Sequence, residues 1–213
     1  MKTTHFTVIS IFSLALATSC GGASAPAAGG KTAPKGAPVA DAKDAPPAVV
    51  DVPKLTINEA DWVAKNLKDV SPMINVTIKA PKDATFEKNG NGGVDIKLAP
   101  FYMLTVGNLA VSNLKEALEW GDSSSIKNSS FQGGKKLVED PNGFVFAYQM
   151  KDEANGTKYA PEAHFYHFIE KDGAVYSVND TKPMDAFSTP PEAYTEALAR
   201  QVHGIVKASA TAN

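Results

Sequence analysis

The sequence has little cysteine and little net charge. Its 213 residues include a single cysteine, Cys20, so an intramolecular disulfide cannot form. A zinc site built from several thiolates is excluded for the same reason. Lysine and arginine number 21 against 23 aspartates and glutamates, a formal net charge of -2. Without a strong basic field, we do not expect the chain to bind nucleic acid.

The sequence also lacks an apolar run long enough to cross a bilayer as a helix, which needs about 20 residues. The apolar stretch over residues 6–17 follows Lys2 and ends before the small residues Thr18 and Ser19. Its length and its flanks are typical of a signal peptide, with Cys20 at the cleavage point.

This segment, residues 1–20, resembles the signal of bacterial lipoproteins, the lipobox. In that family the cysteine thiol takes a diacylglyceryl group and the cysteine becomes the mature N-terminus. The resemblance implies a signal peptide over residues 1–19, lipidation of Cys20, and a membrane partner bound through the lipid anchor. Gly21 follows the cysteine where Asp would favour inner-membrane retention, so the resemblance implies the periplasmic face of the outer membrane.

The sequence departs from the lipobox at Ala17, where the family most often has leucine. An ordinary secretory signal is the alternative, because Ala17 and Ser19 are the small residues that such a cleavage site needs. If Cys20 is not lipidated, we expect a secreted protein with a free thiol.

Residues 21–50 are dominated by ten alanines, five prolines and five glycines, with no aromatic residue. Such a segment cannot bury enough apolar surface to offset its ordering entropy. We therefore expect residues 20–50 to be a lipidated cysteine and a disordered tether. Residues 51–208 are expected to form one domain, and residues 209–213 a disordered tail.

Helical patterns occur at three places in the domain. Thr56 with Glu59 fits a capping box, which predicts a helix over residues 57–68. Asn113 and Thr189 are candidate caps of two later helices. These two helices are expected from residue 113 to about 121 and over residues 190–207.

Strand patterns occupy most of the remaining domain. Residues 140–143 and the Asp172–Gly173 pair are turn signals between apolar runs, and they predict two hairpins. Alternation or apolar runs predict strands over residues 74–79, 94–98, 101–106, 135–139, 144–150, 164–170 and 174–178. Because hairpins dominate, the expected fold class is α+β, a mostly antiparallel sheet of about six to seven strands with helices packed on it.

The order of these elements resembles the PsbP-like fold, which includes an extrinsic photosystem II subunit and many small bacterial lipoproteins. The resemblance is carried by residues 74–81 at the start of the domain, by residues 140–145 in the central hairpin, and by the closing helix. It covers about residues 72–207. The fold mostly hosts binding or accessory roles and has no shared catalytic motif, so no functional residue carries over.

Glu162, His164 and His167 form the only local cluster that resembles a metal site. In a strand, residues three apart point to opposite faces, so His164 and His167 cannot bind one ion there. We expect two sheet histidines, one packed and one partly exposed. They remain candidate site residues for a metal or for catalysis, while the expected sets of catalytic residues, metal ligands and cofactors are empty.

Residues 121–123, Gly-Asp-Ser, resemble the nucleophile block of GDS-type esterases, but they follow a helix instead of an early strand. The Asp-x-x-His pair of that family is missing, since Arg200 lies three residues before His203. We therefore interpret Ser123 as part of a polar loop.

Seven aromatic residues gather in the second half of the domain. They can fill the core on both faces of the sheet, or leave one face as an open apolar groove. We expect a non-enzymatic binding or accessory module with an envelope protein as a possible partner. The alternatives are a carrier or chaperone for a small apolar ligand and, third, a hydrolase that uses His164 or His167. The aromatic residues are Phe144, Phe146, Tyr148, Phe165, Tyr166, Phe168 and Tyr176.

Overall fold

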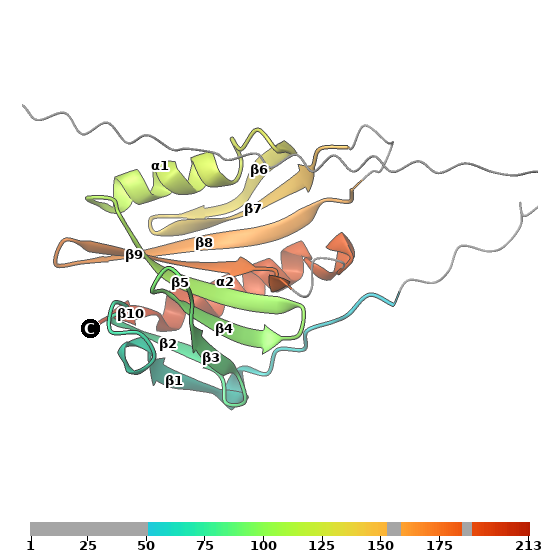
Figure 1. Ribbon diagram of the computed structural model, residues 1–213. Coiled ribbons are helices and arrows are strands. Elements are labelled where there is room, and N and C mark those ends of the chain that lie inside the picture. Colours follow the sequence, from blue (N-terminus) through green and yellow to red (C-terminus); the bar gives the residue numbers. More distant parts are fainter. Residues whose placement is uncertain (1–50, 153–158, 185–188) are drawn as a thin grey trace, which may run out of the picture. The chain divides into compact units, whose positions relative to one another are not determined.

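A seven-stranded antiparallel sheet is the centre of the computed structural model, which describes residues 51–152, 159–184 and 189–213 (Figure 1). All described residues belong to one unit, Ala48–Asn213. The strand order is β3-β4-β5-β9-β8-β7-β6. The strands are β3 (Thr85–Lys88), β4 (Val94–Ala99), β5 (Tyr102–Leu109), β6 (Phe131–Asp140), β7 (Gly143–Met150), β8 (Glu162–Lys171) and β9 (Ala174–Thr181).

The two hairpins at residues 140–143 and 172–173 form as predicted. Asp140 pairs with Gly143 at the end of β6–β7, and Lys171 pairs with Ala174 at the end of β8–β9. Asp172 and Gly173 have φ values of 52° and 78°, the left-handed conformation that a tight two-residue hairpin turn requires. The α+β class and the antiparallel sheet are therefore confirmed.

A smaller three-stranded sheet, in the order β1-β2-β10, was not predicted. Its strands are β1 (Trp62–Asn66), β2 (Val76–Pro81) and β10 (Thr211–Ala212). The backbone N–H of Asn213 donates to Asn75 O, and Asn75 Nδ2 donates back to Asn213 O. The expected disordered tail at residues 209–213 is therefore wrong, because these last residues pair with β2.

The helix predicted over residues 57–68 is also wrong. A single 3-10 turn, η1 (Glu59–Asp61), leads into β1, and a second, η2 (Leu67–Asp69), follows it. Trp62 is the one buried residue of β1, and residues 62–66 form a strand because they pair with β2. Asn58, not Thr56, caps the first turn, because its side chain accepts from Ala60 N.

The helices α1 (Leu114–Ser124) and α2 (Glu196–Ser209) cover opposite faces of the large sheet. Ala117 of α1 packs with Phe144, whereas Val202 of α2 packs with Val145, and successive residues of a strand point to opposite faces. The apolar clusters on both faces are buried.

The caps of the two helices differ in how well they were predicted. Asn113 accepts from Glu116 N at 3.0 Å, as expected, although α1 continues past Gly121 to Ser124. Thr195, not Thr189, caps α2 by accepting from Leu198 N. The prolines before it form a separate 3-10 turn, η4 (Pro191–Ala193). In the described part of the chain, no helix has the length and apolar character needed to cross a membrane.

The predicted signal peptide, the lipidation of Cys20 and the tether over residues 20–50 lie outside the described residues.

Candidate functional site

The two histidines singled out in the sequence both lie on β8, and both are buried. His164 is 5% exposed and His167 is 4% exposed, so the expectation of one partly exposed ring is wrong. Their rings contact different neighbours, as the alternation of the strand requires. The structure therefore keeps His164 and His167 apart and places each in a cluster of its own.

His164 lies between two carboxylates. Its Nδ1 is 3.0 Å from Asp180 Oδ2, and its Nε2 is 3.2 Å from Glu162 Oε2. The second oxygen of Asp180 accepts from the backbone N–H of Phe165 at 2.9 Å. Glu162 and His164 begin β8, and Asp180 lies at the end of the adjacent β9, just past the Tyr166–Asn179 pair where the pairing of the two strands ends.

The carboxylates control the charge of His164. Burial alone would lower the pKa of His164, but the negative charges and hydrogen bonds of Asp180 and Glu162 outweigh it and raise the pKa to about 9. The ring is therefore an imidazolium at neutral pH. Lys182 Nζ binds Glu162 Oε1 at 2.5 Å, so two cations face two anions.

Aromatic rings enclose this charged cluster. The Tyr148 ring stacks on His164 at 5.3 Å between centroids and on Phe131 at 3.9 Å. The Tyr194 ring lies 5.3 Å from His164, and its hydroxyl donates to Phe101 O. Lys182 Nζ lies 4.6 Å from the Tyr194 ring centre, a cation–π contact.

Three cavities, of about 450, 370 and 270 Å³, have Tyr148 in their walls. We name them together the Tyr148 cleft. Glu162 lines the two larger cavities, and Lys182 lines the largest and the smallest. The remaining wall of the largest cavity is formed by Phe131, Met150, Tyr159, Thr189, Pro190 and Pro191.

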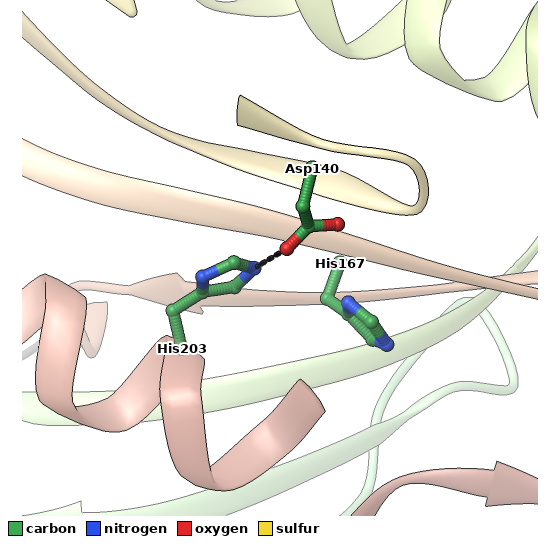
Figure 2. Close-up of side chains that lie close together, drawn as sticks. All are labelled: Asp140, His167 and His203. Carbon is green, nitrogen blue, oxygen red and sulfur yellow. Dashed lines mark ion pairs between the residues drawn. The ribbon is translucent and has the colours of Figure 1, made fainter. Parts of the chain in front are cut away.

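His167 lies in a second cluster, with Asp140 of β6 and His203 of α2 (Figure 2). The side chains offer ligand atoms that all lie within 4.8 Å of one another. His203 Nε2 is 3.7 Å from Asp140 Oδ2, and Lys207 Nζ is 3.1 Å from the same oxygen. Burial, followed by the proximity of His203, lowers the pKa of His167 to about 4, so its ring is neutral at neutral pH.

The sequence placed Glu162 beside His164, but Asp180 and both partners of His167 were missed. The two-residue turn at residues 172–173 fixes the register of β8 and β9 as far as the Tyr166–Asn179 pair, which puts Asp180 near the start of β8 but does not by itself place it against His164. Asp140 and His167 lie in one row of the sheet, on either side of Gly143, whereas the contact of His203 depends on how α2 packs on the sheet.

The residues 121–123 do not form a nucleophile site. They lie within α1, where the Ser123 hydroxyl donates to Glu119 O of the preceding turn. Both ring nitrogens of His164 are bound to carboxylates, so this ring has no free nitrogen to act as a general base.

Comparison of the chain with protein-family models, with curated proteins and with solved structures finds no match.

Proposed function

We propose that the protein is a membrane-anchored lipoprotein of the bacterial cell envelope whose α+β domain is a non-enzymatic binding module. Its ligand would lie in the Tyr148 cleft. The observation that carries this proposal is that the three cavities meet at one aromatic side chain, with a buried ion cluster in their walls.

The size and the walls of the cleft support a small ligand. Ligand sites are typically concave, about 300–1,000 Å³ in volume, and mostly apolar with a few convergent polar groups. Phe131, Tyr148 and Pro190 supply the apolar walls, while Glu162 and Lys182 supply the polar groups. The charges in the cluster cancel, so the ligand we propose has an aromatic or apolar body and a hydrogen-bonding group.

The chemistry of the cluster supports binding over catalysis. The carboxylates of Glu162 and Asp180 hold His164 protonated, and Lys182 neutralises Glu162. A general base needs a free nitrogen at neutral pH. Both nitrogens of His164 are used to hold Glu162 and Asp180 in place at the cleft.

The anchor is supported by the sequence that ends at Cys20. Multiple acyl chains hold a protein on a membrane almost permanently, at about 0.8 kcal/mol per buried methylene. A flexible segment as long as residues 21–50 spans about 30 Å, enough to hold the domain off the membrane surface. An outer-membrane location is part of the same proposal. So is the PsbP-like fold, which the antiparallel sheet and its flanking helices support. So is an envelope protein partner.

A second candidate function is carriage of a small apolar ligand. It is favoured by the largest cavity, of about 450 Å³, where Phe131, Met150, Pro190 and Pro191 line much of the wall.

Titration with 1-anilinonaphthalene-8-sulfonate, an apolar double ring with one anionic group, tests the binding proposal. We expect saturable binding at one site and a loss of at least about tenfold in affinity in Tyr148→Ala, because the ring shared by all three cavities is removed. A tenfold loss corresponds to about 1.4 kcal/mol.

Trp120→Ala is the matched control, because Trp120 is 38% exposed on α1 and lines none of the three cavities. Non-saturable binding, or equal losses in the two variants, would contradict the proposal. Displacement of the probe by palmitate would distinguish the carrier function.

A further inference from the structure

A carboxylate and two imidazoles meet beside α2, outside the Tyr148 cleft. Asp140 ends β6, His167 lies in the middle of β8, and His203 lies in α2. Figure 2 shows Asp140 and His203 pointing toward each other with His167 beside them. Their ligand atoms all lie within 4.8 Å of one another, so one ion could contact all three.

The two imidazoles present buried nitrogens without hydrogen bonds. His167 Nδ1 and His203 Nε2 have no hydrogen-bond partner in the described part of the chain, whereas Asp140 Oδ2 is paired with Lys207. The other oxygen of Asp140 is used, because it accepts from Asn142 N at 2.8 Å. Unsatisfied buried polar atoms are rare in proteins and require an explanation, and two imidazole nitrogens beside one carboxylate are explained by a bound ion.

The donor set selects the class of ion. Two imidazoles and one carboxylate suit zinc and other divalent transition metals, whereas Mg²⁺ and Ca²⁺ prefer all-oxygen ligands. Three protein ligands leave at least one coordination position for water or another molecule. A cavity of about 290 Å³, lined by Asp140, Asn142, His167 and Lys207, gives room for that ligand and a path for the metal.

Lys207 lies at the edge of the site. Its Nζ lies 3.1 Å from Asp140 Oδ2, and its side chain is 53% exposed, so it can turn into water when an ion arrives. Lys207 would therefore compete with the ion for Asp140, but it would not block the site.

We propose that Asp140, His167 and His203 bind one divalent transition-metal ion, with zinc as the reference metal, and that Lys207 competes with the metal for Asp140. This site is independent of the ligand proposed for the Tyr148 cleft.

The test uses the full chain in detergent with Cys20→Ser, which removes the only thiol. After dialysis against EDTA, the chain is titrated with Co²⁺ while visible absorption is followed, and then with Zn²⁺ by calorimetry. We expect one ion per chain and visible Co²⁺ bands that Zn²⁺ abolishes. His167→Gln and His203→Gln should each weaken Zn²⁺ binding at least about tenfold.

Lys207→Met keeps the proposal testable if the histidine variants do not fold, because the changed side chain is exposed. It should strengthen Zn²⁺ binding about three- to tenfold, while Lys115→Met, at an 85% exposed side chain of α1, should leave it unchanged.

Absence of saturable Co²⁺ bands would overturn the proposal. So would bands that survive both histidine substitutions in folded protein, or equal affinities in Lys207→Met and Lys115→Met.

Discussion

Two histidines three residues apart on β8 have pKa values shifted in opposite directions. Asp180 and Glu162 contact His164 and raise its pKa to about 9 in spite of complete burial. His167 has the weaker influence of Asp140 and lies against His203, so burial dominates and lowers its pKa to about 4. Residue type and burial are the same, and the neighbouring charges decide the outcome.

The charge of His164 predicts a pH dependence of stability. Its pKa is 6.5 when unfolded and about 9 when folded, so its contribution is complete below pH 6.5 and is lost as pH rises through about 9. We expect the free energy of unfolding to fall by roughly 3 kcal/mol across that window, since each pKa unit corresponds to about 1.4 kcal/mol. Denaturant unfolding at a series of pH values measures this change.

His164→Gln provides the reference for that measurement. It leaves Glu162 and Asp180 buried without the cation between them, so we expect about 3–5 kcal/mol of destabilisation at neutral pH. The difference between the two proteins should shrink toward pH 9. A difference that is constant from pH 6.5 to 9 would show that the ring is neutral in the folded protein.

At the scale of elements, the close approach of β7 and β8 depends on Gly143. A Cβ added there would lie 2.2 Å from Tyr166 O and 3.0 Å from His167 Cα, and both are backbone atoms that cannot turn away. We expect Gly143→Ala to destabilise the protein by at least about 2 kcal/mol, measured by denaturant unfolding.

Gly90→Ala is the control, because a Cβ at Gly90 meets no atom within 4 Å. It should change the free energy of unfolding by less than about 0.5 kcal/mol. Equal effects of the two substitutions would mean that the two strands can separate at Gly143 without cost.

The elements that the sequence predicted are those with local causes. The turn at Asp172–Gly173 and the cap at Asn113 need only neighbouring residues, and both form as expected. The strands β1, β3 and β10 were missed, and β10 is defined only by pairing with β2 from the far end of the chain. A short run such as residues 62–66 fits helix or strand until its pairing is known.

The two histidine clusters could be predicted only in part, because some of their contacts are local in the sequence and others are long-range. His164 and His167 were recognised as candidates, and the hairpin register would have put Asp180 near the start of β8 without showing that it contacts His164. His203 lies on the apolar stripe of α2. A polar residue there indicates a site only when its partner on the sheet is known. Asp140 looked like a turn residue, which it also is.

On the scale of the whole molecule, we propose that each part of the chain has its own role. Residues 1–19 would export it, Cys20 would anchor it, and residues 21–50 would hold the domain away from the membrane. Within the domain, the Tyr148 cleft and the cluster at Asp140 involve different residues, so each can be removed without the other.

The central claim is that this protein is anchored in the cell envelope, and lipidation of Cys20 is the part of the claim that can be measured directly. The most direct measurement is the intact mass of the protein expressed with its own leader and extracted in detergent, beside Cys20→Ser. We predict a mature chain that begins at Cys20 and carries acyl chains, which are absent from the variant. A mature chain without lipid, identical in behaviour to Cys20→Ser, would contradict the account and describe a secreted protein.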